Sequence, residues 1–138
     1  MRKTIEVTAA VFFSEFNILA AKRLPGKHLA GYWEFPGGKI EPGETPEQCL
    51  KRELKEEFTI ESEIGEFVAE SIFDYGDKRI RLLAYKVKHL SGEFQLIDHD
   101  EIRWLPIEEL DSLKWAPADL PIIKALKQAK KSQLFKFF

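Results

Sequence analysis

The apolar positions at the start of the chain predict two strands. Residues 4–13 are rich in β-branched and aromatic side chains, a composition typical of a mostly buried strand. A turn over residues 14–17 follows, and residues 18–22 resemble the returning strand. The next stretch, RLPGKHLAGYWEFPGG, contains glycines and prolines that exclude a long regular element. We therefore expect a hairpin followed by an irregular loop.

A second hairpin is predicted in the middle of the chain. Residues 66–75 and 79–90 both alternate apolar and polar side chains, which is the pattern of half-buried strands. The two runs flank Gly76-Asp77, a dipeptide suited to a tight turn. The pattern therefore indicates two antiparallel neighbours in a sheet.

The C-terminal part reads as a short strand followed by helices. We expect a strand over residues 101–105, a helical turn over 107–110 and a closing helix over 117–131. No repeat or low-complexity segment divides the chain, so residues 1–138 are expected to form one α+β domain with a mixed sheet between helices. The tail, about residues 130–138, could pack on the body, join a dimer or touch a membrane surface.

Composition narrows the class of protein. The 138 residues are 44% hydrophobic and 32% charged, and 21 basic and 23 acidic residues leave a net charge of −2. This balance is not that of a disordered or membrane protein, nor of one that coats nucleic acid. No apolar run approaches the roughly 18 residues of a membrane span. The N-terminal stretch is interrupted by Glu6, which favours a strand over a leader peptide.

The single cysteine, Cys49, cannot form an intrachain disulfide or a zinc site by itself. A reducing, cytoplasmic location is the simplest interpretation. We expect neither a nucleic-acid polymer nor a membrane among the partners, and a monomer or a homodimer.

A strongly acidic helix follows the loop. Thr45 can cap it, Pro46 suits its first position, and Gln48 can reach back as in a capping box. The apolar residues Leu50, Leu54 and Phe58 share one face of this helix.

Three glutamates lie on a neighbouring face of the same helix. Glu53, Glu56 and Glu57 fall within an arc of about 100°, so their charges repel one another. A cation between them would reverse this repulsion, and several hard carboxylate oxygens suit Mg²⁺ or Mn²⁺. Ordinary helix solvation is the alternative, and spacing alone does not decide between the two.

The stretch GGKIEPGETPEQCLKRELKEEFTI resembles the Nudix box, G-x5-E-x7-R-E-U-x-E-E-x-G-U, where U is a bulky aliphatic residue. Gly38 begins the match, Glu44 follows, and Arg52-Glu53 begin the helical part. Thr59 stands where the family has glycine. Because a β-branched residue is strained in the left-handed conformation of a helix end, we expect this helix to end differently.

The resemblance extends over roughly residues 4–127. The segments EFPGGKIE and APADLPII are similar to the MutT branch of the Nudix hydrolases and its CTP pyrophosphohydrolase relatives. The resemblance implies an α/β/α sandwich and Mg²⁺-dependent hydrolysis of a nucleoside triphosphate to the monophosphate and diphosphate. It also implies a role in nucleotide-pool sanitation, with Mn²⁺ as a possible substitute metal.

The resemblance also implies roles in metal binding. Glu53, Glu56, Glu57 and the Gly37 carbonyl match metal ligands, and Asp98 matches an acid that helps to bind metal or to activate water. Arg52 is expected to orient the carboxylates, and Glu44 to fix the loop against the helix. Glu53 and Asp98 are rival general bases. Neither Cys49 nor any serine is placed to suggest a covalent intermediate.

A second group of residues is expected to bind the substrate. Arg23 matches a contact to phosphate or sugar, and Phe35 or Trp33 could offer an aromatic face to a base. The full set comprises Arg23, His28, Glu34, Phe35, Gly37, Gly38, Lys39 and Asp119. Several of these residues also have an alternative interpretation. Arg23 could be an exposed residue at a strand end, His28 an incidental loop residue, and the two rings part of the core.

Asp119 bears on the choice of base. MutT-type enzymes have an asparagine there that reads 8-oxoguanine. An ionised aspartate only accepts hydrogen bonds, which favours the N4 amino group of cytosine but does not exclude oxidised purines. Its alternative role is to cap a helix over residues 120–128.

Two other functions remain open at this point. One is hydrolysis of dinucleoside polyphosphates, since Tyr75 lies where that branch often has tyrosine. The other is a non-catalytic Nudix-fold regulator that binds nucleotide, although all the box carboxylates are present. The APADLPII segment argues against the first, and the absence of a proline near position 75 argues against ADP-ribose hydrolysis.

Overall fold

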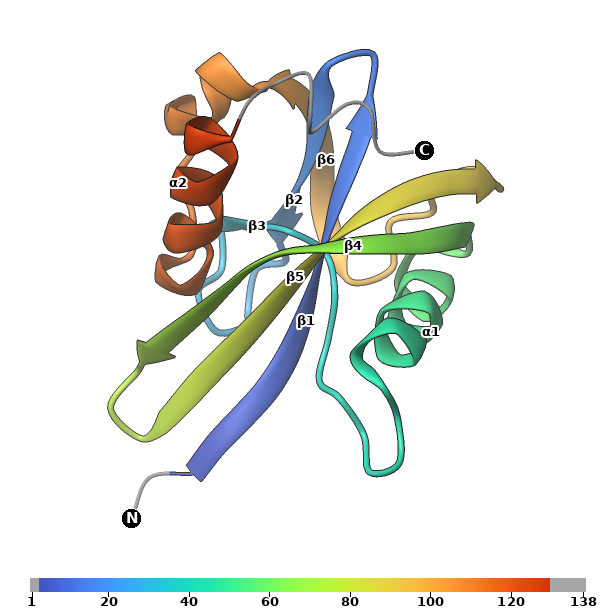
Figure 1. Ribbon diagram of the computed structural model, residues 1–138. Coiled ribbons are helices and arrows are strands. Elements are labelled where there is room, and N and C mark those ends of the chain that lie inside the picture. The colour runs from blue at the N-terminus through green and yellow to red at the C-terminus, as the bar shows by residue number, and fades with distance from the viewer. Residues whose placement is uncertain (1–2, 130–138) are drawn as a thin grey trace.

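A computed structural model describes residues 3–129 of the chain (Figure 1). The elements are, in order, β1 (Lys3–Ser14), β2 (Asn17–Arg23), β3 (Trp33–Glu34), α1 (Pro46–Phe58), β4 (Glu61–Asp74), β5 (Lys78–Ser91), β6 (His99–Pro106), the 3-10 helices η1 (Ile107–Ser112) and η2 (Pro117–Asp119), and α2 (Leu120–Gln128).

The strands form a mixed sheet in the order β3-β2-β1-β5-β4, with β6 paired to β2. Strands β1 and β5 are parallel, whereas β1–β2, β4–β5, β2–β3 and β2–β6 are antiparallel. The two predicted hairpins, β1–β2 and β4–β5, are therefore confirmed.

Two apolar clusters fill the spaces on either side of the sheet. In β1, Ala9 and Val11 belong to the cluster that contains residues of α2, while Ala10 and Phe12 belong to the cluster that contains residues of α1. This alternation follows from the two-residue period of a strand. Figure 1 shows α1 and α2 on opposite sides of the strands. The predicted α+β sandwich with a mixed sheet is confirmed.

Two predicted boundaries were wrong. Strand β4 begins at Glu61 instead of residue 66, because irregularities at Ile64/Phe67 and Phe67/Ala69 break the alternation used for the prediction. The closing helix begins with a 3-10 turn, since Pro121 has no N–H for the Pro117 carbonyl, which accepts instead from Leu120. The predicted tail over residues 130–138 lies outside the described residues.

Helix α1 starts as predicted but ends contrary to prediction. Thr45 and Gln48 form both bonds of the capping box, at 3.0 and 3.1 Å. At the other end Thr59 adopts the left-handed conformation (φ 58°, ψ 40°) that we expected it to avoid. Its N–H donates to the Lys55 carbonyl at 3.0 Å, and the Phe58 carbonyl accepts from the Gln95 N–H at 2.9 Å. These bonds hold a β-branched residue in a strained conformation.

Thr59→Gly is therefore expected to stabilise the protein. Glycine adopts the left-handed conformation without the clash of a Cβ atom, and the gain is about 1 kcal/mol after its greater freedom in the unfolded state is subtracted. Chemical denaturation measures it as a higher midpoint with an unchanged slope. An equal or lower midpoint would show that Thr59 is not strained.

No helix within residues 3–129 has the length and apolar character needed to cross a bilayer.

Candidate functional site

The two glycines after Pro36 let the loop pass close to both β1 and α1. The N–H groups of Ala10 and Thr8 donate to the carbonyls of Pro36 and Gly38, at 2.6 and 2.8 Å. A Cβ atom on Gly37 would lie 1.9 Å from the Thr8 carbonyl oxygen, and one on Gly38 would lie 2.3 Å from Cδ of Glu53. Because alternate carbonyls of this extended segment bond to β1, the Gly37 carbonyl between them is directed away from the strand.

Arg52 is the centre of the hydrogen-bond network on α1. Its Nε and Nη2 donate to the Glu44 carboxylate at 2.6 and 2.9 Å, and its Nη1 donates to Glu53 at 2.7 Å and to Glu56 at 3.2 Å. Glu44 also accepts from the Glu41 N–H, and its hydrogen bonds, chiefly those from Arg52, lower its pKa to about 2. Glu44 thus bonds to both the loop and the helix, and Arg52 bonds to three of the carboxylates; that it orients them for catalysis stays a prediction.

Glu57 is the most unusual acid in this group. It is 9% exposed, and its Oε1 is buried without a hydrogen-bond partner. Burial raises the pKa of Glu57 to about 9, and the nearby charges of Glu53, Glu34 and Asp98 add to the shift. Burial also raises the pKa of Glu53. Buried Glu57 and partly buried Glu53 thus both have raised pKa values on one helix face, and Glu57 in particular requires either a proton or a cation.

The donor set fits a hard divalent cation. Carboxylate and backbone carbonyl oxygens are the ligands that Mg²⁺ and Mn²⁺ prefer, and Oε1 of Glu57 is a buried oxygen without a hydrogen-bond partner. Within residues 3–129, however, no three acidic, histidine or cysteine side chains converge as a ready ligand group. Arg52 holds Glu53 and Glu56, and Lys27 lies 3.5 Å from Asp98, so these cations now balance the acids.

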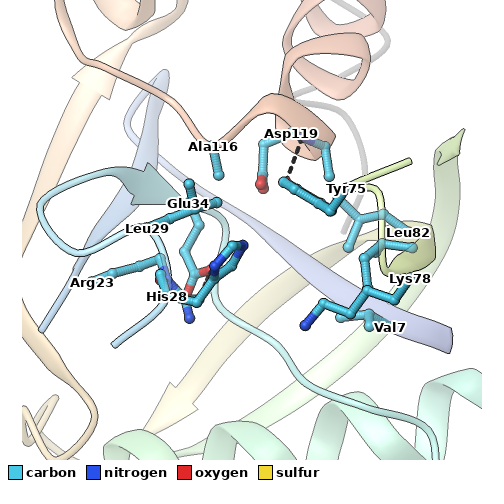
Figure 2. Close-up of a pocket in the computed structure, with 12 residues that line it drawn as sticks. Val7, Arg23, His28, Leu29, Glu34, Tyr75, Lys78, Leu82, Ala116 and Asp119 are labelled. Carbon is cyan, nitrogen blue, oxygen red and sulfur yellow. Dashed lines mark hydrogen bonds and ion pairs between the residues drawn. The ribbon is translucent and has the colours of Figure 1, made fainter. Parts of the chain in front are cut away.

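A pocket is lined by Glu34, whose charge also acts on Glu57 of the acidic face (Figure 2). Four of the predicted substrate-binding residues line it: Arg23, His28, Glu34 and Asp119. Figure 2 shows Asp119 at one end of the pocket, Arg23 and His28 on one wall, and Lys78 on the other. The His28 ring packs edge-on against Tyr75, with centroids 5.4 Å apart. Sequence reasoning missed Lys78, because it lies on a distant strand and belongs to no motif.

The Asp119 side chain is buried and bonded to the protein backbone. Its Oδ1 accepts from the Phe35 N–H at 3.0 Å, and the residue is 5% exposed. Burial, and to a lesser degree the charge of Glu34, raises its pKa well above the ordinary value. The alternative role as a helix cap is wrong, since the side chain makes no capping hydrogen bond to α2.

The expectation of an aromatic face for a base is not met by Trp33 or Phe35. Both rings are buried in the core, at 5% and 3% exposure, and Phe35 packs on Trp115 with centroids 4.8 Å apart. Phe35 reaches the pocket wall through its backbone N–H to Asp119. Lys39 is exposed and does not line the pocket; its carbonyl accepts from Arg52 at 3.3 Å.

Glu34 joins the pocket to a histidine that sequence reasoning left without a role. Its Oε1 accepts from Arg23 Nη1 at 2.7 Å, and its Oε2 lies 2.8 Å from Nε2 of His99. Only the adjacency of His99 to Asp98 could have drawn attention to it, because the contact with Glu34 spans 65 positions.

Comparison with known proteins identifies the family. Residues 4–126 match the model of the NUDIX domain. The chain belongs to the Nudix family. The phosphate chemistry implied by the box on α1 is therefore that of a Nudix hydrolase, and enzymes of this family generally need a divalent metal ion.

Similar proteins fall in the MutT branch of this family. The CTP pyrophosphohydrolase of Escherichia coli is 41% identical over 123 residues, which cover 89% of this chain and 91% of that protein. The 8-oxo-dGTP diphosphatase of Haemophilus influenzae is 38% identical, covering 91% and 93%. The solution structure of the E. coli ORF135 protein superposes with a TM-score of 0.82 at 40% identity, covering 91% of this chain and 90% of that one.

Proposed function

We propose that this Nudix hydrolase is a Mg²⁺-dependent nucleoside triphosphate pyrophosphohydrolase, which converts a (d)NTP and water to the (d)NMP and diphosphate. The observation that carries the proposal is the buried, partnerless Oε1 of Glu57 on the acidic face of α1. The charge of Glu34 acts on Glu57, and Glu34 lines the pocket together with Arg23 and Asp119. A role in nucleotide-pool sanitation fits the named activities of the relatives.

Glu53, Glu56, Glu57, the Gly37 carbonyl and Asp98 are the groups that would hold the metal. When bound, Mg²⁺ supplies charge neutralisation of the phosphates and a lowered pKa for a coordinated water. Arg52 keeps Glu53 and Glu56 on one side of the helix. Mn²⁺ is the natural substitute for Mg²⁺ at such oxygen ligands.

The chain's own residues then handle the proton and the leaving group. We assign the general base to Glu53, because this partly buried carboxyl has a raised pKa, whereas Asp98 is 42% exposed and paired with Lys27. Glu53 accepts the proton as the water oxygen attacks the β-phosphorus. The bond from that phosphorus to the bridging oxygen breaks, and the oxygen leaves on the monophosphate. Arg23, fixed at the pocket wall by Glu34, contacts phosphate or sugar.

The pocket favours a cytosine nucleotide. The N–H of Phe35 donates a hydrogen bond to Oδ1 of Asp119, so Oδ2 is the oxygen that can bind a ligand. When ionised, this oxygen accepts from the N4 amino group of cytosine; when neutral, it donates to a ring acceptor such as cytosine N3. An N–H on the edge of 8-oxoguanine offers the same kind of contact, and 8-oxo-dGTP is the second candidate because the related H. influenzae enzyme is named for it.

A panel of nucleotides with Mg²⁺ tests this function. The protein is incubated with CTP, 5-modified dCTP, 8-oxo-dGTP, the ordinary dNTPs and a dinucleoside polyphosphate, and diphosphate and phosphate are measured separately. Release of diphosphate with the monophosphate from a cytosine nucleotide or 8-oxo-dGTP is expected. Turnover of the dinucleoside polyphosphate alone would favour that hydrolase activity, and Tyr75 in the pocket wall is the observation that retains it. Binding without turnover of any compound would indicate a regulatory module.

Asp119→Ala is expected to reduce discrimination between bases. Losing one hydrogen bond to a base edge costs about 1–3 kcal/mol, so kcat/KM for the preferred base should fall roughly 10- to 100-fold while that for the others changes little. Asp119→Asn should move the preference towards 8-oxo-dGTP. Asp111→Ala is the matched control, since Asp111 is exposed and paired with Lys127. Unchanged selectivity in Asp119→Ala would remove the base-reading role.

The same proposal includes a single Nudix domain over residues 1–138, a cytoplasmic location, and a monomer or homodimer as the active form. Size-exclusion chromatography with light scattering distinguishes the two assemblies.

A further inference from the structure

A buried histidine lies between the acidic helix and the pocket. His99, the first residue of β6, is 3% exposed. Its ring stacks on Phe58, with centroids 5.1 Å apart and planes 10° from parallel. Phe58 is the last residue of α1 and follows directly after Glu57. One face of the imidazole is therefore fixed by the end of the helix that carries the acids.

The Nε2 edge of the ring lies against Glu34, which lines the pocket. His99 Nε2 lies 2.8 Å from Oε2 of Glu34, whose other oxygen accepts from Nη1 of Arg23 at 2.7 Å. Arg23 also donates through Nε to the His28 carbonyl at 2.6 Å. The guanidinium is thus held at two points, and one of them depends on a carboxylate that His99 orients. Charge-assisted bonds of this kind define both distance and direction.

Backbone pairing places the same residues together. Arg23 and His99 are partners across β2 and β6, and the register of these strands shifts between Lys22 and Arg23. A bulge turns the side chain that follows it, and bulges occur next to active sites for this reason. Here the shift lies at the residue that enters the pocket. The ring of His99, the carboxylate of Glu34 and the guanidinium of Arg23 form one continuous chain of contacts.

We infer that His99 is a positioning residue, which acts through Glu34 to hold Arg23 where the substrate's phosphate or sugar binds. The inference rests on the proposed function, because Arg23 is a substrate contact only there. A ring that served packing alone would need no nitrogen at this place, since phenylalanine would stack on Phe58 equally well. The imidazole N–H adds only the contact with Glu34, and this contact leads to Arg23.

The test compares His99→Phe with Arg23→Ala and with the double variant. His99→Phe keeps the stacking on Phe58 and removes the contact with Glu34. We expect KM to rise roughly tenfold and kcat to change less than twofold, because Arg23 loses its place while the acids of α1 keep theirs. Arg23→Ala should raise KM at least as much. In the double variant His99→Phe should add nothing, since the residue through which it acts is absent.

A second readout does not depend on turnover. The nucleoside monophosphate product is titrated into each variant by calorimetry, and its dissociation constant should rise in parallel with KM. His89→Phe is the matched control: His89 also packs on an aromatic ring, that of Phe94, and bonds to the Gly92 carbonyl at 2.6 Å outside the pocket. It should leave KM and product affinity unchanged.

The outcomes separate this inference from the proposed function. If Arg23→Ala raises KM and His99→Phe does not, the positioning role is wrong while the substrate contact stands. If both raise KM and their effects multiply in the double variant, His99 does not act through Arg23. If Arg23→Ala leaves KM unchanged, the assignment of Arg23 in the proposed function is wrong, and the role of His99 falls with it.

Discussion

Glu57→Gln is expected to abolish hydrolysis and, in the absence of metal, to stabilise the protein. The loss of activity should be at least about a thousandfold, because one metal-ligating carboxylate contributes several kcal/mol to the stabilisation of the transition state. The gain in stability has a separate cause. Glu57 is buried with one oxygen that has no partner, and its pKa is raised from 4.5 to about 9. Glutamine is neutral at every pH, so the folding of the variant requires neither the uptake of a proton nor a cation at this position.

The direction of the pH dependence follows from this shift. The folded state binds the proton of Glu57 more tightly than the unfolded state, so its contribution to stability is fully present below about pH 4.5 and is lost as the pH rises towards 9. Each pH unit in this window changes the free energy of unfolding by about 1.4 kcal/mol. At pH 7 the metal-free protein is therefore destabilised by Glu57 on the order of 3 kcal/mol, an upper bound.

Chemical denaturation with a chelator at pH 4 and at pH 7 measures this effect. Glu57→Gln should be more stable than the parent protein at pH 7 and nearly equal to it at pH 4. Added Mg²⁺ should stabilise the parent protein and not the variant, since only the parent binds it at this position. Glu47→Gln, an exposed glutamate of the same helix, is the control and should show neither effect. A Glu57→Gln variant that is active, or less stable at pH 7 in the chelator, would contradict the assignment.

The second large effect is expected from the two glycines of the loop. In Gly37→Ala the new Cβ would lie 1.9 Å from the Thr8 carbonyl oxygen, a backbone atom that cannot move without disturbing β1. We expect a loss of about 3 kcal/mol or more in the free energy of unfolding, at the upper end for overpacking. In Gly38→Ala the Cβ meets the Glu53 side chain at 2.3 Å, which can turn away. That variant should fold with a smaller loss of stability.

Activity should distinguish these two variants more sharply than stability does. Gly38→Ala displaces Glu53, which is both a proposed metal ligand and the proposed general base, so kcat should fall about a hundredfold or more. Gly43→Ala is the control, because its Cβ meets nothing within 4 Å and its φ of +85° leaves only backbone strain, about 1 kcal/mol. It should retain its kcat. Equal kcat values in Gly38→Ala and Gly43→Ala would show that Gly38 does not hold the place of Glu53.

The parts of the fold that were predicted correctly depend on neighbours in sequence. The capping box of Thr45 and Gln48, the first turn at Pro46 and the apolar face of α1 all follow from residues within one or two turns. The strand pattern of β1 was visible for the same reason. Rules based on neighbouring residues failed at the end of α1, where a distant contact determines the conformation. Thr59 keeps a strained conformation there, and the Phe58 carbonyl before it accepts from the Gln95 N–H.

The functional site likewise has one part that local sequence predicts and one part that depends on distant contacts. The box itself specified Arg52, Glu53, Glu56 and Glu57, because all of them lie on one helix. The pocket could not be assembled from sequence, since Asp119 meets the Phe35 N–H across 84 positions and Glu34 meets His99 across 65. The burial of the Phe35 ring likewise depends on Trp115. Such contacts are set by strand order and register, which short-range patterns do not determine.

Titration of Mn²⁺ into the protein without nucleotide, followed by electron paramagnetic resonance, measures whether the acidic face of α1, with Glu57 as its buried member, binds a divalent cation. We predict saturable binding by the parent protein, competition by Mg²⁺, release of protons near pH 8 as Glu57 ionises, and loss of that binding in Glu57→Gln. Equal Mn²⁺ affinity in the parent and in Glu57→Gln would show that Glu57 does not ligate the metal.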